Sequence, residues 1–579
     1  MKLKKTVFSF LAFLAFLAFF VLFIQCESSK IIDRPNIILI MADDMGYSDL
    51  ACFGGEINTP NINNLAMNGL RFTQFYNAAR CCPSRASLLT GLYPQQAGMG
   101  HMTEAGDRGT HAYQGDLSKN AVTIAEVLKT VGYSTYLSGK WHITPYLDAI
   151  EDIKNPDKSN WPIQRGFDKF FGMISGAGSF YDPRSLALNN KYIAPSKDFY
   201  FTDNVTDYAI DQITQNKNKN PFFMYVAYTA PHWPLQAPKE DIEKYKGKYN
   251  KGWDKIRKNR MTRMKEMGLI KKEWELSPRD SDVEEWSDEI EDREWQIRNM
   301  EVYAAMIDRM DQGIGKIIES LKNKGVYENT LIFFLQDNGA CAEDLSWVTN
   351  NTISKELQKP MDPLALQTKM VPLITREGVP VKLMKKATAG GPESYVAYSA
   401  PWANASNTPF REYKHWVHEG GIATPLIVHW PKSINAKGDL RWEPSHLIDI
   451  MATCIEVSGA KYPKTYKGNQ ITPLEGISLV PAFENKPLNR QAIYWEHEGN
   501  RAVRMGKWKL VSKADKNNMK WDQMEELIFE DWELYDMVLD RTETKNISNR
   551  YPDKVKIMSS MWMSWAKKTG AIPRPNYPY

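Results

Sequence analysis

The chain is poor in cysteine and in net charge, and it contains no internal repeat. Its 579 residues include 6 cysteines, too few for the disulfide framework that stabilises many exported proteins. The 73 Lys and Arg residues nearly balance the 69 Asp and Glu residues, which leaves a net charge of +4. This balance excludes the basic excess of a nucleic-acid-binding protein, so any charged function must be local. A hydrophobic content of 43% is enough for a large core, in several domains or in one large domain with an appendage.

The N-terminus has the pattern of an export signal. Three lysines within the first five residues precede an apolar run from Val7 to Ile24, so we predict that the chain leaves the cytoplasm. Residues 1–26 are then a cleaved signal peptide, an uncleaved anchor or, because Cys26 follows the run, the lipidated start of a lipoprotein. The predicted location is accordingly the periplasm, the membrane surface or the medium.

The rest of the chain follows an α/β pattern. Continuous apolar runs typical of strands buried on both faces occur at Asn36–Ala42, Pro221–Tyr228, Thr330–Gln336 and Pro425–Trp430. Helical periodicity separates them, most clearly at Thr123–Gly132 and Glu301–Gly325. Alternation of strand and helix predicts a large, mostly parallel sheet sandwiched by helices, in a domain expected over residues 34–488.

Three further segments differ in composition from this pattern. Residues 239–298 are dense in charge and Trp and are predicted to form a helical insertion on the surface. Residues 342–407 have weak periodicity, and a long irregular segment inside a compact domain is more often functional than not. Residues 489–579 contain short strands and then a helix near Lys554–Lys567, which predicts a small antiparallel domain.

Polar oxygen donors directly follow two of the predicted buried strands. Asp43 and Asp44 come after the first, and Asp337 and Asn338 after the third. Either pair alone is explained by a turn or a helix cap. Both together, at the strand ends where α/β sheets bind their ligands, favour a hard cation such as Ca²⁺ or Mg²⁺.

Two adjacent cysteines stand in the stretch "RCCPSRASLLTG", Arg80–Gly91. Pro83 suits a first helical position and Gly91 a helix end, so Cys81 is expected just ahead of a helix N-terminus, with Arg85 about one turn inside. From the chemistry alone, Cys81 is either a buried thiol or a nucleophile with a lowered pKa.

The same stretch resembles the C-x-P-S-R-x-x-x-L-T-G signature of type I sulfatases, in the alkaline phosphatase-like superfamily. Other stretches resemble this family in the same order, and those toward the C-terminus are most like its bacterial arylsulfatase branch. They are "NIILIMADDMGY", "SGKWH", "APHWP", "QDNGA", "FREYKHWVHEGGIATPLIVHWP", "WEHEGNRAVRMGKWKLV" and "WELYDMVLDRTETKNIS". The resemblance covers nearly everything after the N-terminal run.

The resemblance implies that Cys81 is oxidised to formylglycine by a formylglycine-generating or sulfatase-maturating enzyme, and that Cys82 is a variable position. The hydrated aldehyde then attacks sulfur, cleaves the S–O bond of a sulfate ester, and releases sulfate through its second hydroxyl. The family's Ca²⁺ ligands map onto Asp43, Asp44, Asp337 and Asn338, joined by the oxygen of residue 81.

The remaining site residues also follow from the resemblance. Arg85 holds residue 81, and Lys140 and Lys414 are cations near the sulfate. His142 is a base for the elimination step, and His232 protonates or stabilises the leaving oxygen. Without the resemblance, each of these residues is as readily explained as a surface or packed side chain, and His497 stands out only as a candidate substrate contact.

The stretches "GKWHITPYLD" and "FREYKHW" depart from the usual family pattern in the residues beside the predicted catalytic groups. The substrate is therefore left open, with a sulfated glycan as the natural candidate. Two alternatives stay open: a phosphonate monoester or phosphodiester hydrolase of the same superfamily, and an inactive carbohydrate-binding surface protein.

Overall fold

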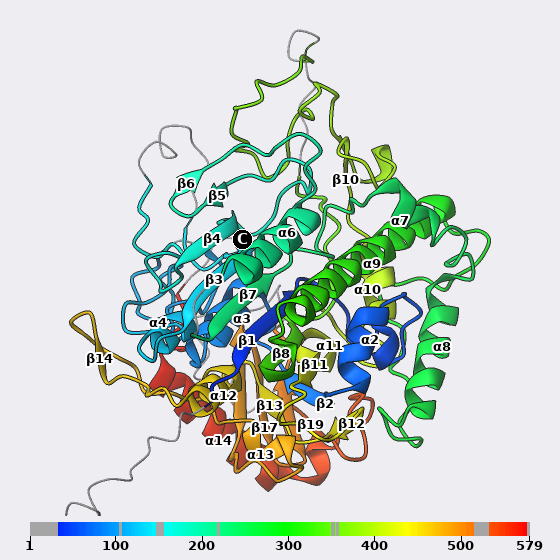
Figure 1. The fold of residues 1–579 in the computed structure, drawn as a ribbon. Helices are drawn as coiled ribbons and strands as arrows, with labels where there is room; N and C mark the ends of the chain where they lie inside the picture. The colour runs from blue at the N-terminus through cyan, green and yellow to red at the C-terminus, as the bar shows by residue number, and fades with distance from the viewer. Residues whose placement is uncertain are drawn as a thin grey trace, which may run out of the picture.

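The computed structural model describes residues 33–103, 107–145, 156–216, 220–348, 354, 358–514 and 532–575. The predicted export signal and Cys26 lie outside these residues. Within them, the centre of the molecule is a mixed eleven-stranded sheet (Figure 1). Its strands are β1 (Asn36–Ala42), β2 (Leu70–Tyr76), β3 (Ser134–Gly139), β4 (Lys169–Met173), β5 (Leu186–Leu188), β6 (Lys191–Tyr192), β7 (Phe222–Ala227), β8 (Thr330–Gln336), β11 (Ala423–His429), β12 (Asp439–Arg441) and β13 (Ser445–His446).

The strands run in the order β12-β2-β11-β8-β1-β7-β3-β4-β5-β6, and β13 also pairs with β2. The four central strands β8, β1, β7 and β3 are parallel, with Ile37 of β1 level with Leu331 of β8 and Phe223 of β7. Strand β11 is antiparallel to both of its neighbours. Because the central strands are parallel, their carboxyl ends meet along one edge of the sheet.

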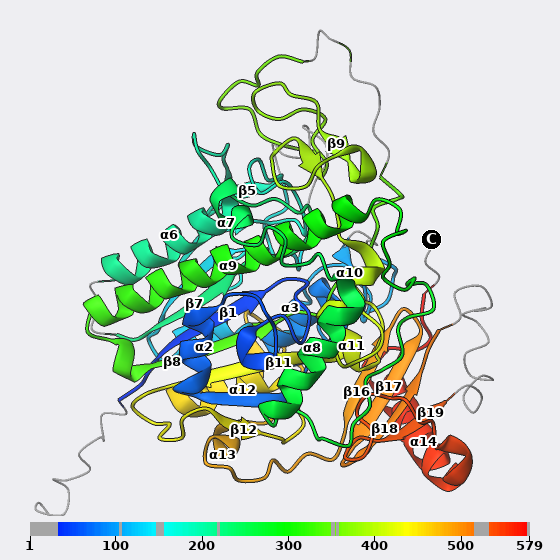
Figure 2. The same ribbon diagram turned by 90° about the vertical axis from the view of Figure 1, so that its right-hand side faces the viewer.

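Helices cover both faces of the sheet, as Figure 2 shows. Helices α2 (Pro60–Met67), α6 (Phe201–Gln215) and α9 (Arg293–Asn323) share one core cluster with Ile38 and Ile40 of β1. Helices α3 (Cys81–Thr90), α4 (Ile124–Lys129) and α12 (Asp449–Ser458) share the other with Ile37 and Leu39. Alternate residues of β1 thus face opposite layers, as in any strand buried on both sides.

Two helix starts can be compared with the sequence prediction. At α4, in the predicted helical stretch Thr123–Gly132, a capping box is present: Thr123 Oγ1 accepts from the backbone N–H of Glu126 at 3.1 Å, and the Glu126 carboxylate accepts from the backbone N–H of Thr123 at 2.9 Å. Helix α3 begins at Cys81 and not at Pro83. Pro83 still falls in the first turn, where backbone N–H groups have no partner within the helix, so its missing N–H costs nothing there.

The predicted helical insertion is helical only in part. It contains α7 (Lys239–Glu243), α8 (Gly252–Glu266) and the start of α9, but residues 267–292 have no helix or strand. This stretch contains Pro278 and a run of acidic residues whose like charges disfavour helix. The irregular segment contains β9 (Lys382–Leu383), η5 (Met384–Lys386), β10 (Ser394–Tyr395) and α10 (Ser399–Ser406). Other short elements are η1 (Ala51–Phe53), η3 (Tyr327–Asn329), α11 (Glu419–Ile422), β14 (Thr465–Tyr466), β15 (Asn469–Gln470), α13 (Val480–Phe483) and η8 (Ser548–Arg550).

The C-terminal part forms the predicted small antiparallel sheet with one helix. Strands β16 (Ile493–His497), β17 (Asn500–Met505), β18 (Trp508–Ser512) and β19 (Glu533–Asp536) pair in chain order, and α14 (Pro552–Thr569) packs on them (Figure 2). Together with the large sheet, this is the alkaline phosphatase-like architecture that the sequence predicts.

A fully buried network of charges joins the small sheet to the catalytic part. The Glu419 carboxylate accepts from Lys509 Nζ at 2.9 Å and from Arg541 Nε at 2.7 Å, and Lys509 also pairs with Glu543 at 2.8 Å. Burial alone raises the pKa of Glu419, but Lys509 and Arg541 outweigh it and lower the pKa from 4.5 to about 2. Glu419 is therefore ionised in the folded protein and links α11 to the C-terminal part.

Replacing Glu419 with glutamine is expected to lower the free energy of unfolding by about 3–5 kcal/mol, because Arg541 then lacks its buried counter-charge and Lys509 keeps only Glu543. A carboxyl with a lowered pKa stabilises the fold above its unfolded value, so this contribution is lost as pH falls from about 4.5 to about 2. Thermal and denaturant unfolding between pH 2 and pH 7, a range set by that pKa shift, measure both effects. The exposed Glu484, paired with Lys486, gives the control Glu484→Gln, and equal losses in both variants would contradict the assignment.

Candidate active site

The predicted site residues follow the carboxyl ends of the four central parallel strands. Asp43 and Asp44 follow β1, Asp337 and Asn338 follow β8, Lys140 and His142 follow β3, and His232 lies in the loop after β7. Helix α3 adds Cys81 and Arg85, and the loop before α11 adds Lys414. All ten side chains are buried. Ten residues from six separate segments are thus brought to the end of the sheet where ligands bind in this fold class.

Three carboxylates and three cations alternate in this site. Asp43 Oδ2 accepts from Lys140 Nζ at 2.6 Å, and Asp44 Oδ2 accepts from Lys414 Nζ at 3.0 Å. Arg85 donates to Asp337 Oδ2 at 2.9 Å and lies 3.4 Å from Asp43 Oδ2. Each of these charges thus has at least one neighbour of opposite sign, as buried charges require.

The protein's own cations do not compensate the carboxylates fully. Burial, and then the negative charge of Asp43, raise the pKa of Asp337 well above its usual value. Among the described residues, Asp43 Oδ1 and Asn338 Oδ1 are buried without a hydrogen-bond partner. Oxygens of Asp43 and Asp44 and a ring nitrogen of His232 also lie within 4.8 Å of one another. Unpaired, mainly oxygen donors beside three buried carboxylates fit a hard divalent cation such as Ca²⁺.

Residue 81 lies in the first turn of α3, directly after the extended Arg80. Its side chain is buried, and Cys81, Cys82 and His142 offer ligand atoms within 4.8 Å of one another. A hydrogen bond with Cys82 lowers the pKa of the Cys81 thiol, burial opposes this, and Lys140 and Lys414 lower it further, so that the net shift is well below the ordinary value. The surroundings of residue 81 therefore stabilise an anionic nucleophile.

Two site residues have left-handed backbone conformations. Asp44 has φ 62° and His142 has φ 56°. This region is costly for residues other than glycine, by about 1–3 kcal/mol each, and persists only where the surroundings impose it. Such conformations gather at functional sites, which agrees with the other features of this one.

The predicted role of His232, to protonate or stabilise the leaving oxygen, depends on its protonation state. Its Nδ1 lies 2.6 Å from the Trp233 carbonyl, which can only accept, and its Nε2 lies 3.3 Å from Asp44 Oδ2. Burial lowers the pKa of His232, Asp44 opposes the shift and Lys414 adds to it, and the result is a pKa of about 4. The imidazole is therefore neutral near pH 7, with its proton on Nδ1.

The sequence prediction missed a second layer of groups around these residues. Arg80 pairs with Glu343 at 3.1 Å, and Glu343 also accepts from Trp233 Nε1 at 3.0 Å. Glu343 belongs to the irregular segment 342–407. In the sequence, only the unusual length of that segment indicated that a functional residue lies there. Tyr225, inside β7, contacts Arg85 at 3.3 Å and was hidden within an apolar run.

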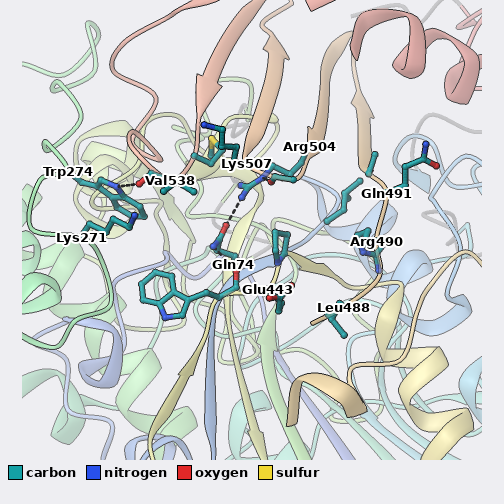
Figure 3. Close-up of a pocket in the computed structure, with 16 residues that line it drawn as sticks. Gln74, Lys271, Trp274, Glu443, Leu488, Arg490, Gln491, Arg504, Lys507 and Val538 are labelled. Atoms are coloured by element: carbon teal, nitrogen blue, oxygen red, sulfur yellow. Dashed lines mark hydrogen bonds between the residues drawn. The ribbon is translucent and has the colours of Figure 1, made fainter. Parts of the chain in front are cut away.

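A separate cavity of about 440 Å³ lies where the small sheet meets the large one (Figure 3). None of the ten site residues lines it. Two of its cations already have partners, since Arg504 donates to Gln74 at 2.8 Å and Lys507 pairs with Asp536 at 2.6 Å. The cavity is thus distinct from the candidate active site.

Comparison with known proteins agrees with this geometry. The family model described as Sulfatase matches residues 35–460, and the model described as N-sulphoglucosamine sulphohydrolase, C-terminal, matches residues 411–569. The chain belongs to the sulfatase family. It is 32% identical to an uncharacterized sulfatase of Schizosaccharomyces pombe, over 95% of this chain and 96% of that one. It is 33% identical to an arylsulfatase of Klebsiella aerogenes, over 79% of this chain and 94% of that one. The protein is therefore a sulfatase, an enzyme that hydrolyses sulfate esters.

Solved structures share the fold over almost the full length. Ps i-CgsB in complex with k-i-k-neocarrahexaose aligns with a TM-score of 0.61 at 25% identity, covering 92% of this chain and 93% of that one. A protein in complex with its substrate D-glucosamine-2-N,6-O-disulfate aligns with a TM-score of 0.57 at 20% identity, covering 94% and 99%. The second likeness shows the fold alone. Among the described residues of the enzyme, none of the helices is long and apolar enough to cross a membrane.

Proposed function

We propose that the enzyme cleaves the S–O bond of sulfate monoesters, with a formylglycine derived from Cys81 as nucleophile and one bound Ca²⁺. Sulfated carbohydrate is the proposed natural substrate. The observation that carries this proposal is the surroundings of residue 81, a buried side chain whose pKa is lowered by the charges of Lys140 and Lys414, in a site where Asp43 Oδ1 and Asn338 Oδ1 have no hydrogen-bond partner among the described residues.

A Ca²⁺ ion and the hydrated aldehyde of residue 81 complete the proposed site. Asp43, Asp44, Asp337, Asn338 and the oxygen of residue 81 would hold the Ca²⁺, which supplies positive charge to the sulfate and favours an ionised nucleophile. The hydrated aldehyde supplies two hydroxyls on one carbon, one to take the sulfuryl group and one to expel sulfate.

The chain's own residues bind and orient the sulfate ester. The Lys140 ammonium is fully buried. Burial lowers its pKa most, but Asp43, Cys81 and Asp337 together outweigh burial and the net shift is upward, so Lys140 stays charged. Lys414 is held charged in the same way by Asp44. Both cations are in place before substrate arrives, and such fixed charges stabilise the negative charge that develops on oxygen as the S–O bond breaks. Arg85 orients the carboxylates through Asp337 and Asp43.

The two histidines are proposed as the proton-transfer groups. His142 lies beside Cys81 and would accept the proton when sulfate is expelled. His232 is neutral in the free enzyme, but a bound sulfate ester adds negative charge next to it, which raises its pKa toward the working pH. Nε2 could then carry the proton that the leaving oxygen takes.

The rim of the site suits a carbohydrate. Trp233, next to His232, lies with its ring centroid 6.3 Å from that of Trp347, whose side chain is 58% exposed. Exposed aromatic rings offer flat apolar faces that stack on sugar rings. Solved structures with this fold contain sulfated or oligomeric sugars, as their names state, which supports the same substrate class.

The proposal is tested by rates on matched aryl sulfate and aryl phosphonate monoesters. A phosphonate monoester hydrolase of Agrobacterium radiobacter shares the fold with a TM-score of 0.52 at 18% identity. We expect kcat/KM to be higher for the sulfate. A higher value for the phosphonate would assign the enzyme to that reaction, and saccharide binding without turnover of either ester would indicate an inactive binding protein.

Removal of the metal is expected to abolish turnover and to lower the thermal midpoint. Without Ca²⁺ the buried carboxylates of Asp43 and Asp337 face each other with too little positive charge. The measurement is activity and thermal unfolding after treatment with a chelator, then again after addition of Ca²⁺. Full activity in chelated enzyme shown to contain no metal would exclude the proposed metal site.

Replacing the exposed Trp347 with alanine is expected to raise KM for a sulfated oligosaccharide by roughly twofold to tenfold, the size of one aromatic stacking contact. The value for a small aryl sulfate should hardly change, because that substrate does not reach the rim. The exposed Trp442, which lines the separate cavity, provides the control Trp442→Ala. Equal effects on both substrates would rule out a role in saccharide binding.

The proposed chemistry implies a partner and a location. A maturation enzyme must oxidise Cys81 before the site can work, and export places the enzyme in the periplasm, on the membrane through its N-terminus, or in the medium. We further propose that the chain consists of a catalytic domain, residues 34–488, and a C-terminal domain, residues 489–579.

A further inference from the structure

We propose that the enzyme has a second, separate metal site, in which His101, His415, His497 and Glu498 bind a transition-metal ion such as Zn²⁺. None of these residues belongs to the ten of the active site. They come from three segments distant in the sequence: the loop after α3, the loop that carries Lys414, and the end of β16 with the turn that follows it.

The four side chains form one compact cluster. The Glu498 carboxylate pairs with His101 Nε2 at 2.9 Å and with His415 Nδ1 at 2.7 Å, while His497 Nε2 lies 3.6 Å away from it. The ring of His497 stands between the other two imidazoles, at centroid distances of 5.7 Å and 5.6 Å. The ligand atoms of His415, His497 and Glu498 all lie within 4.8 Å of one another.

These distances are close to those of a zinc site. Ligand atoms about 2.0–2.1 Å from a tetrahedral Zn²⁺ are roughly 3.3 Å from each other. The three spacings between the imidazoles and the Glu498 carboxylate, 2.7, 2.9 and 3.6 Å, bracket that value, and the ligand atoms of His415 and His497 lie within 4.8 Å of each other, so small rotations of the side chains would bring the imidazoles around one ion. The same surroundings leave both ring nitrogens of the buried His497 without a hydrogen-bond partner among the described residues, a costly arrangement that a metal bond to one of them would relieve.

The chemistry of the ligands distinguishes this site from the active site. Three imidazoles and one carboxylate suit Zn²⁺ and its neighbours in the transition series, whereas the oxygen donors of the active site suit Ca²⁺. The nearest cation, Arg80, is paired with Glu343 at 3.1 Å and so opposes a metal less than a free cation would.

The backbone holds the ligands and leaves a path for the ion. His415 has φ 92° and Glu498 has φ 48°, both in the left-handed region that residues other than glycine seldom adopt. The side chains of His101 and His415 keep 16% and 10% of their surface exposed, so an ion can reach the cluster from solvent. A metal here would tie the loop of Lys414 to the C-terminal sheet.

The test is a Co²⁺ titration followed by visible absorption, on the full-length Cys81→Ala variant in excess Ca²⁺. This background removes the reactive side chain of residue 81 and fills the carboxylate site. We expect about one Co²⁺ per chain, displaced by Zn²⁺, with the spectrum of nitrogen and oxygen ligands. Binding should weaken at least about tenfold in His497→Ala and in His101→Ala, and be unchanged in His111→Ala, an exposed histidine of the same loop.

Three outcomes would overturn the proposal: no saturable binding, a spectrum with thiolate ligands, or unchanged affinity in His497→Ala and His101→Ala. Circular dichroism and the metal-free thermal midpoint show whether each variant is folded. Because His101 is partly exposed, its truncation tests the site even where loss of the buried His497 disturbs the fold.

Discussion

Replacing Cys81 with alanine is expected to lower kcat by at least about 10⁴-fold, the scale found when a catalytic nucleophile is removed. Residue 81 is the side chain on which Lys140, Lys414 and His142 converge, and alanine can neither be oxidised to an aldehyde nor attack sulfur. The fold should survive, because the substitution removes one atom from a buried helix start. The measurement is kcat on an aryl sulfate, with thermal unfolding to confirm folding.

The adjacent cysteine provides the matched control. Cys82 is equally buried in α3 but is outside the proposed nucleophile chemistry, so Cys82→Ala should keep most of the activity. Mass spectrometry of the peptide that contains both cysteines should show a loss of about 18 Da localised to residue 81 in active enzyme. Aryl sulfate turnover by protein with an unmodified thiol at residue 81 would exclude the proposed nucleophile.

Replacing Lys140 with alanine is expected to lower kcat by about 10²–10³-fold, as for the loss of one fixed group that stabilises transition-state charge. Lys140 Nζ lies 2.6 Å from Asp43 Oδ2 and is fully buried. Its removal therefore leaves Asp43 with one cation fewer as well as taking a charge from the sulfate. Steady-state kinetics should show the loss mainly in kcat, and a rise in KM alone would indicate that Lys140 only binds substrate.

Lys129 is the matched control for this substitution. It is the last residue of α4, the helix before β3, and its ion pair with Asp168, at 2.7 Å, is more than one-third exposed on both sides. Exposed pairs contribute little, so Lys129→Ala should change neither kcat nor stability appreciably. A loss in Lys129→Ala comparable to that in Lys140→Ala would point to a general effect on this part of the fold.

Much of the fold could be predicted from local pattern. The apolar runs at Asn36–Ala42 and Thr330–Gln336 are β1 and β8 residue for residue, and the strands and final helix of the C-terminal part are present as predicted. However, an apolar run does not indicate the direction in which its strand runs. The antiparallel orientation of β11 could therefore not be predicted from the sequence. Helix α9 begins at Arg293, eight residues before the predicted start at Glu301, because its polar first turns show little periodicity.

The candidate site was predictable only where motifs mark it. All ten site residues named from the sequence lie together, although their roles stay predictions. Glu343, Glu419 and the cluster around Glu498 were not predicted, because each acquires its partners from segments that are remote in the chain. Glu419 and Arg541, for example, are 122 positions apart and meet only once both domains are folded. Local patterns predict elements, but they do not predict which distant charges will be neighbours.

The burial of residue 81 also limits when the proposed modification of Cys81 could take place. In the folded enzyme the Cys81 side chain is only 1% exposed, so it would be almost inaccessible to a maturation enzyme. Lys414, one of the residues around Cys81, is synthesised 333 residues after Cys81. At about 5–20 residues per second, synthesis leaves roughly 20–70 s in which Cys81 has emerged and its pocket does not yet exist. Translation speed, and the time the chain spends unfolded during export, would therefore set the fraction of molecules that become active.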